Sequence, residues 1–130
     1  MTALSNYSEL KILDHLFRNT SYTSPNAYIG LFTSDPTDAG TGTEVSGNGY
    51  ARVQIDNKMD AAATGAITSN SDITFPTASG GAFGTITHIG IFDASTSGNL
   101  LAHGSLTAAK TISDGDTMQI NSGSLTISID

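Results

Sequence analysis

Apolar positions recur at three- and four-residue steps in one stretch near the start of the chain, residues 6–18 (NYSELKILDHLFR). That spacing places them on a single face of an α-helix. The face consists of Tyr7, Leu10, Leu13, Leu16 and Phe17. Asn6 followed by Glu9 has the spacing of a capping box, which predicts Asn6 as the residue that caps the first turn of the helix. The apolar face has two interpretations: it packs on the protein's own sheet, the ordinary fate of an amphipathic helix, or it docks on a neighbouring subunit.

Beyond residue 25 the pattern changes to the two-residue alternation of β-strands. The segment NAYIGLFTS (26–34) is rich in β-branched and aromatic residues. In ITSNSDITFP (67–76), Ile73 and Phe75 share one face. The segment YARVQID (50–56) alternates cleanly, which predicts that one set faces the core, Ala51, Val53 and Ile55, and the other faces solvent, Tyr50, Arg52 and Gln54.

Two hairpins are predicted in the second half of the chain. TITHIGIFD (85–93) and NLLAHGSLT (99–107) flank a loop of ordinary hairpin length. TMQINSGSLTISID (117–130) has a turn signal at Ser122-Gly123. Short strands separated by polar turns predict a mainly β fold, an antiparallel β-sandwich or small β-barrel with one N-terminal amphipathic helix. The predicted organisation is an N-terminal helix or arm over 1–20 and a single sandwich domain over 21–130.

A long polar loop interrupts the sandwich at residues 34–49 (SDPTDAGTGTEVSGNG). This loop is rich in Gly, Asp and Thr, and it contains almost no apolar residue. Long ordered loops in small domains often carry function, so this loop is a candidate interaction site.

Charge and composition exclude several functions. The formal net charge is −7, and the five Lys and Arg residues are widely scattered, so we expect no nucleic-acid binding. The chain has no cysteine, hence no disulfide or thiol chemistry. The N-terminus lacks a signal-peptide pattern and no membrane span is visible, which predicts synthesis in a cytoplasm and no membrane partner.

His88 and His103 lie on the two strands of the first predicted hairpin. They face each other if Asp93 pairs with Gly98 and point to opposite faces if Asp93 pairs with Asn99, and the sequence leaves both registers open. Two imidazoles without further ligands do not make a zinc site, so the pair is predicted to be structural.

No catalytic or cofactor site is predicted. Asp114 and Asp116 put oxygen atoms in a loop but do not match a specific calcium-binding pattern, and Asp and Gly are also the commonest turn formers. There is no nucleophile elbow and no phosphate-binding loop with its lysine. A sugar-cleaving cleft usually carries aromatic platforms, and tryptophan is absent. We therefore expect a protein that is not an enzyme and needs no metal or cofactor.

Three stretches carry a resemblance: FRNTSYT after the predicted helix, GLFTSDPTDAGTGTEVSGNGYAR, and THIGIFDASTSGNLLAHG. Together they resemble a family of tailed-bacteriophage virion structural proteins, capsid decoration or cement proteins often labelled phage tail fibre proteins. The resemblance implies a virion protein, on the outer capsid surface by preference, with the major capsid protein and further copies of itself as partners, a trimer matching a threefold capsid position. The alternative is a tail adaptor or short tail-fibre module that binds tail proteins or host surface glycans.

On the decoration interpretation the interface residues can be named. The apolar helix face would pack on the sheet or on a neighbour. The polar loop would reach capsid subunits or sister copies, with glycines that permit close backbone approach. The loop candidates are Asp35, Asp38, Gly40, Gly42, Gly47 and Gly49. Arg18 and Arg52 would fix the register of the contact more than its strength.

Overall fold

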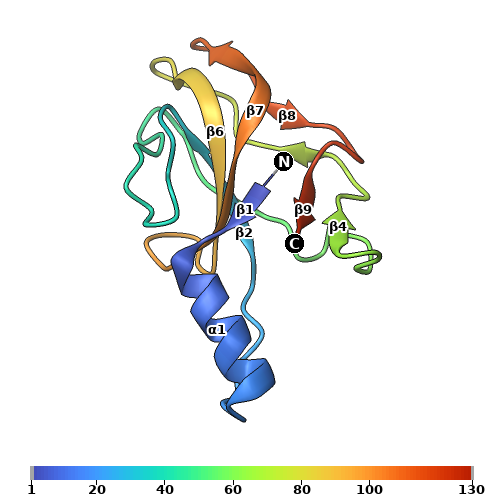
Figure 1. Cartoon of the computed structure of the whole chain (residues 1–130). Helices are drawn as coiled ribbons and strands as arrows, with labels where there is room; N and C mark the ends of the chain where they lie inside the picture. Colours follow the sequence, from blue (N-terminus) through green and yellow to red (C-terminus); the bar gives the residue numbers. More distant parts are fainter. Residues whose placement is uncertain (1, 130) are drawn as a thin grey trace.

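The structure, a computed structural model, describes residues 2–129 and centres on one five-stranded antiparallel sheet (Figure 1). Two long neighbouring strands, β6 (Gly84–Phe92) and β7 (Leu100–Ile112), form its middle. Strand β2 (Tyr28–Phe32) pairs with the other edge of β6, and β3 (Val53–Gln54) pairs with β2. Strand β1 (Thr2–Leu4), which the sequence pattern did not predict, pairs with the outer edge of β7.

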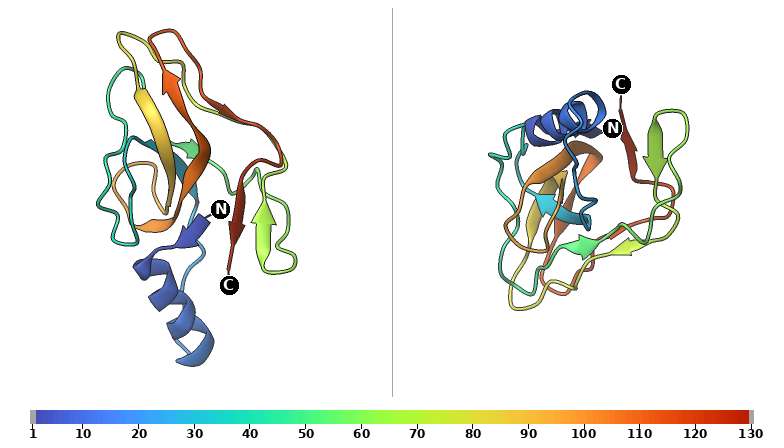
Figure 2. Two further views of the ribbon diagram at one scale, coloured as in Figure 1. Left: turned by 45° about the horizontal axis from the view of Figure 1, so that its top comes forward. Right: turned by 90° about the horizontal axis from the view of Figure 1, so that it is seen from below.

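A second, smaller layer covers one face of this sheet (Figure 2). It contains two short antiparallel ladders, β4 (Ala66–Thr68) with β9 (Thr126–Ser128), and β5 (Ile73–Thr74) with β8 (Gln119–Ile120). The two layers form a sandwich-like arrangement that does not close into a barrel. The predicted fold class, mainly antiparallel β with one N-terminal helix, is confirmed.

The main core lies between the two layers. Inward positions of β2 and β6 supply Ile29, Leu31, Ile89 and Ile91, each at most 4% exposed. The opposite layer supplies Ile73, Phe75 and Leu125 to the same cluster, and Ile55, directly after β3, joins them. The predicted inward face of Ile73 and Phe75 is confirmed, since their exposed fractions are 0% and 2%.

A second cluster lies on the other face of the sheet, beside the 34–49 loop. Phe32 and Phe92 stack with their ring centroids 6.0 Å apart, and Leu100 joins them. Gly90 leaves room for these rings, because a Cβ there would lie 2.8 Å from Cε2 of Phe32. The sheet therefore has apolar side chains on both faces, and the loop has a surface to pack against.

The predicted orientation of residues 50–56 is wrong for three positions. Tyr50 is half-buried, only 7% of the Arg52 side chain is exposed, and Ala51 is exposed, whereas Ile55 is buried as expected. The Tyr50 ring stacks on Phe75, and its hydroxyl accepts a hydrogen bond from the Leu31 amide at 2.9 Å. The strict alternation fails because only Val53–Gln54 form a strand, so residues 50–52 follow loop geometry. Burial and the hydrogen bond to Glu44 raise the pKa of Tyr50.

The second predicted hairpin is also wrong. The chain does turn at Ser122-Gly123, where Gly123 has a φ of 81°. The flanking strands do not pair with each other, because β8 pairs with β5 and β9 pairs with β4. A local turn signal fixes the direction of the chain but not the strand that completes each ladder.

The histidine register differs from both alternatives. His88 pairs with Ser105 and His103 pairs with Gly90, so the two rings share a face of the sheet but lie at different positions along it. The cause is a register shift between Ile91 and Phe92, next to the hairpin loop. His88 contacts Thr87 instead, with Nδ1 2.8 Å from Oγ1.

Candidate assembly surface

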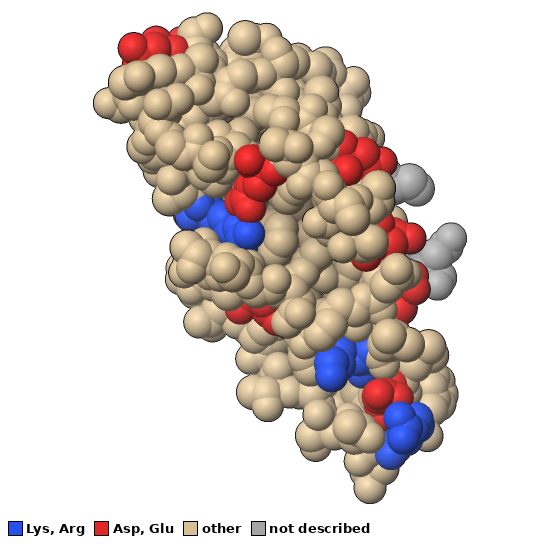
Figure 3. Space-filling model, turned by 90° about the vertical axis from the view of Figure 1, so that its left-hand side faces the viewer, with Lys and Arg blue, Asp and Glu red and all other residues tan. Residues whose placement is uncertain are grey.

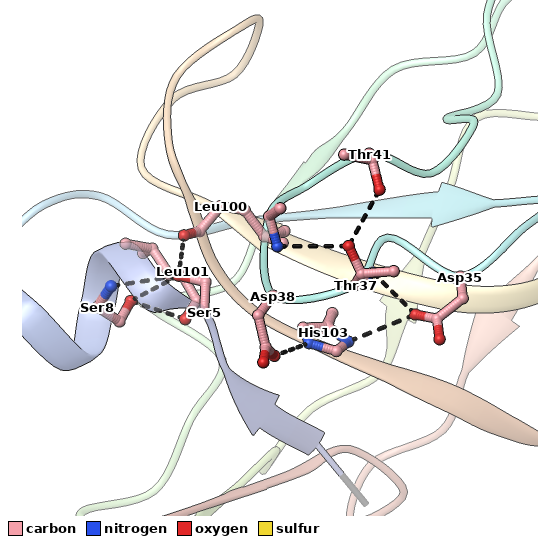
Figure 4. Close-up of polar contacts among 10 residues, drawn as sticks. Ser5, Ser8, Asp35, Thr37, Asp38, Thr41, Leu100, Leu101 and His103 are labelled. Atoms are coloured by element: carbon pink, nitrogen blue, oxygen red, sulfur yellow. Dashed lines mark hydrogen bonds and ion pairs between the residues drawn. The ribbon is translucent and has the colours of Figure 1, made fainter.

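Helix α1 (Asn6–Phe17) is attached to the sheet through its first turn (Figure 4). Its N-cap is Ser5, whose Oγ accepts from the Ser8 amide at 3.2 Å and donates to the Leu100 carbonyl. The Ser8 hydroxyl donates to the Leu101 carbonyl at 2.7 Å. The prediction of Asn6 as cap was therefore wrong by one residue. The backbone of Ser5 is extended, which places its side-chain oxygen against the Ser8 amide in the first turn. The signal missed was Ser5-x-x-Ser8, two hydroxyls three residues apart.

The polar loop provides a second attachment. The Asn6 amide donates to the Asp38 carbonyl at 3.3 Å. Asp38 Oδ1 lies 2.8 Å from Nε2 of His103, and Asp35 Oδ1 lies 3.7 Å from its Nδ1 (Figure 4). Asp35 and Asp38, both predicted interface residues, thus hold the loop on β7 of their own chain, although each side chain remains more than half exposed.

Beyond this attachment, α1 extends away from the sandwich (Figure 1), and most of its apolar face is exposed. The exposed fractions are 64% for Leu10, 54% for Leu13, 63% for Leu16 and 76% for Phe17. The interpretation that this face packs on the protein's own sheet is wrong for these four residues. The sides of the helix that meet the body carry Ser8 and Ile12 instead.

The segment after the helix returns along it. The Tyr22 amide donates to Nδ1 of His15 at 3.3 Å, and the rings of Tyr7 and Tyr22 meet edge to face at 6.4 Å. Tyr7 is therefore half-buried, unlike the four residues above. Arg18 is exposed and pairs with Asp14 at 2.9 Å, an ordinary surface ion pair that contributes roughly 0.5 kcal/mol or less.

An apolar groove of about 340 Å³ lies beside the base of α1. Its walls come from β1, β7, β9 and the returning segment, and its lining includes Leu4, Ile12, Ala27, Met59, Leu101 and Ile127. Tyr22 also lines it, and the buried Tyr22 hydroxyl has no hydrogen-bond partner within residues 2–129. Burial, with Tyr7 nearby, raises the pKa of Tyr22 to about 12.

The Arg52 side chain makes its contacts within its own chain. Its guanidinium makes a bidentate pair with Glu44, with Nε and Nη2 each 2.8 Å from a carboxylate oxygen. Nη1 donates to the carbonyls of Ala94 and Ser97, and the group lies 3.5 Å from the centre of the Phe92 ring. Only 7% of the side chain is exposed. Arg52 therefore ties the end of the polar loop to the β6–β7 loop.

The loop glycines also serve their own chain. Gly40, Gly47 and Gly49 have φ values of 71°, 74° and 82°, which favour glycine. Gly42 has no such φ, but a Cβ there would lie 2.6 Å from the Asp35 carbonyl oxygen. Close backbone approach is thus observed at Gly42, within the loop itself.

The described part of the chain contains no group of three or more His, Asp or Glu side chains that could hold a metal ion. The Asp116 carboxylate accepts from the Ser113 amide at 2.9 Å, which is a turn contact. Among residues 2–129, the structure contains no helix of the length and apolar character that a membrane crossing needs.

Comparison with known proteins identifies the family. A family model described as podophage GP4 fiber I protein gp80 matches residues 3–128. The chain belongs to this family. No curated protein matches the chain. Because the match covers the helix, the polar loop and both layers of the sandwich, the protein is a phage virion structural protein, as the resemblance in the sequence implied.

Replacing Ser5 with alanine will lower the free energy of unfolding by about 2 kcal/mol. The change removes the helix cap and leaves two buried polar groups, the Ser8 amide and the Leu100 carbonyl, without their partner. Urea unfolding followed by circular dichroism measures this change. The matched control is Asn6→Ala, which we expect to cost less than about 0.5 kcal/mol because Asn6 is exposed. A larger loss from Asn6→Ala than from Ser5→Ala would contradict the assignment of the cap.

Proposed function

We propose that the protein is a short fibre module of a tailed phage, attached to the particle through the apolar face of α1. The family description names a fibre protein of a podophage. The observation that carries the proposal is the position of this face. Four large apolar side chains lie on a helix that is firmly attached at one end and extends from the body at the other. Exposure of these apolar side chains to water is unfavourable, and burial against another subunit removes that exposure.

Several hydrogen bonds fix the first turn of α1 to the body, which suits a module that must hold its body in a defined direction. The first turn of α1 is held by β7 through Ser5 and Ser8 and by the polar loop through Asp38. The sandwich at the other end of the molecule is then free to present its loops outward (Figure 1). In this proposal the outward loops contact the host surface, and binding rather than catalysis is the activity.

Capsid decoration is the second candidate, with the major capsid protein as partner. One observation favours it: the described chain is a compact sandwich without the repeats from which an elongated shaft is usually built. An acidic body also suits the outside of a particle. Both candidates use the same apolar face of α1, so they differ in the place on the virion and in copy number.

The test is made on purified virions. We expect Leu13→Asp/Leu16→Asp to be lost from particles although the protein remains folded, because both residues are more than half exposed. The control is Ser95→Asp/Thr96→Asp, which adds the same charge in an exposed loop and should be incorporated normally. Quantitative mass spectrometry gives copy number relative to the major capsid protein. Scarcity supports the fibre, near-equal amounts support decoration, and normal incorporation of the helix variant overturns attachment through α1.

A further inference from the structure

A polar pocket of about 300 Å³ lies between the end of the polar loop and the β6–β7 loop (residues 93–99). The polar loop supplies Glu44 to its lining, and the β6–β7 loop supplies Ser95 and Thr96. Figure 3 shows this side of the molecule, where blue and red atoms lie side by side in a hollow midway along the body. Arg52 also lines the pocket, so both members of the ion pair border a space that is open to solvent.

The ion pair in this pocket is fixed in position by its own chain. Two hydrogen bonds join the Arg52 guanidinium to Glu44, and the guanidinium lies over the Phe92 ring, 3.5 Å from its centre. The Tyr50 hydroxyl donates to Glu44 Oε1 at 2.7 Å. Groups that are held in this way lose little conformational freedom when a ligand binds, which favours affinity.

The pair has one donor and one acceptor position without a partner. A guanidinium has five N–H groups. Nε and Nη2 of Arg52 each donate to Glu44, and Nη1 donates to two backbone carbonyls, so within residues 2–129 the second N–H of Nη2 has no partner. Glu44 Oε1 accepts two hydrogen bonds, whereas Oε2 accepts one, from Nη2 at 2.8 Å. A free donor and a free acceptor position therefore lie on neighbouring atoms, Nη2 and Oε2.

This arrangement indicates which ligand fits. The charges of Arg52 and Glu44 cancel, so the pair favours neither an anion nor a cation. An apolar ligand would cover the free N–H and the carboxylate oxygen without replacing their bonds to water, which is unfavourable. A hydroxyl group both donates and accepts, so two neighbouring hydroxyls match the two free positions. Ser46, Ser95 and Thr96 add hydroxyls to the lining that make no hydrogen bond in the part of the chain that the structure describes.

We propose that this pocket binds a neutral sugar ring through two neighbouring hydroxyl groups, one accepting from Arg52 Nη2 and the other donating to Glu44 Oε2. This inference rests on the proposed function, because it assigns a carbohydrate-binding pocket to the loops that contact the host surface. The Tyr50 ring also lines the pocket but packs on Phe75 and Phe83, so hydrogen bonds rather than ring stacking hold the sugar. We therefore expect a weak Kd for one sugar, of about 1 mM.

The experiment is an NMR titration of the full-length, isotope-labelled protein. The probes are the methyl glycosides of mannose, galactose and glucose, which between them present neighbouring hydroxyls in cis and trans arrangements. We expect at least one of them to shift the Arg52 Nε–H signal and the backbone amide signals of Ser95 and Thr96. Cyclohexanol, a ring of the same size with a single hydroxyl, should bind about tenfold more weakly, because one of the two free positions stays unpaired.

A variant that fills the pocket tests its location. Ala51 lines the pocket and is exposed, so Ala51→Leu reduces the space without disturbing the core, and we expect binding to fall about tenfold or more. Ala62→Leu makes the same change at an exposed loop position outside the pocket and should bind like the native protein. Ser46→Leu, at another exposed lining position, replaces Ala51→Leu if that variant fails to fold. Shifts that survive the filling variant, or no shifts with any of the three glycosides, overturn the sugar pocket.

The outcomes separate this inference from the proposed function. Loss of Leu13→Asp/Leu16→Asp from virions, with no glycoside shifts, keeps attachment through α1 and overturns the pocket. Glycoside shifts with normal incorporation of that helix variant overturn the attachment and keep the pocket. Virions that carry Ala51→Leu should contain the protein in normal amount and adsorb to the host more slowly. Adsorption at the native rate would overturn the role of the pocket in host contact.

Discussion

Replacing Arg52 with methionine will lower the free energy of unfolding by about 3 kcal/mol. The substitution removes both hydrogen bonds to Glu44, the contact with the Phe92 ring and the bonds to the carbonyls of Ala94 and Ser97. Among residues 2–129, the Glu44 carboxylate then keeps one hydrogen bond, from the Tyr50 hydroxyl at 2.7 Å, and 23% of its side chain is exposed. Removing one partner of a mostly buried ion pair leaves an uncompensated charge, which usually costs more than the pair itself contributes.

A double-mutant cycle tests this assignment. Arg52→Met/Glu44→Gln removes the orphaned charge as well as the pair, so we expect it to be more stable than Arg52→Met alone by about 1 kcal/mol. Chemical unfolding measures Arg52→Met, Glu44→Gln and the double variant. If Arg52 served instead as a free surface contact, as the sequence predicted, Arg52→Met would change stability by less than about 0.5 kcal/mol and the cycle would show no coupling.

Replacing Gly42 with alanine will lower the free energy of unfolding by about 2–3 kcal/mol. The new methyl group would lie 2.6 Å from the Asp35 carbonyl oxygen and 2.7 Å from the Pro36 Cα. These are backbone atoms, so the loop must open to relieve the overlap. Opening it moves Asp35 and Asp38 away from His103 and releases the bond from Asp38 to the start of α1.

Gly47→Ala is the matched control for this prediction. Its φ of 74° strains an alanine by about 1–2 kcal/mol, but no described atom lies within 4 Å of its Cβ position. Hydrogen exchange separates the two effects. We expect Gly42→Ala to raise exchange in the loop and in the first turn of α1, and Gly47→Ala to leave the helix unchanged. Equal exchange in α1 for both variants would show that the loop does not hold the helix.

Local patterns predicted the elements well where burial follows the period of the element. The three- and four-residue spacing predicted α1 to within one residue, and alternation placed Ile73 and Phe75 in the core. The patterns failed where one short strand gives way to loop geometry, as at Tyr50 and Arg52, whose side chains form contacts with Glu44, Leu31 and Phe92. An ion pair with a residue in a loop has no periodic signal.

The candidate site was predicted in part. The sequence identified the apolar face of α1, but the interpretation that this face packs on the protein's own sheet required knowledge of where the helix points. That direction depends on two serine hydroxyls and the backbone carbonyls of Leu100 and Leu101, which are nearly a hundred residues away. The groove has no sequence signature, because its walls come from segments spread along almost the whole chain, from Leu4 to Ile127.

The sequence by itself determined the fold class, the amphipathic helix, the excess of acidic charge and, through its resemblance, the phage virion family. Each of these follows from residues that are near one another along the chain or from their totals. Only the tertiary structure decided that α1 extends from the body, that Arg52 and Asp38 are used internally and that an apolar groove lies beside the helix. These features depend on contacts between distant segments, and the register and direction of such contacts are fixed by packing rather than by local preference.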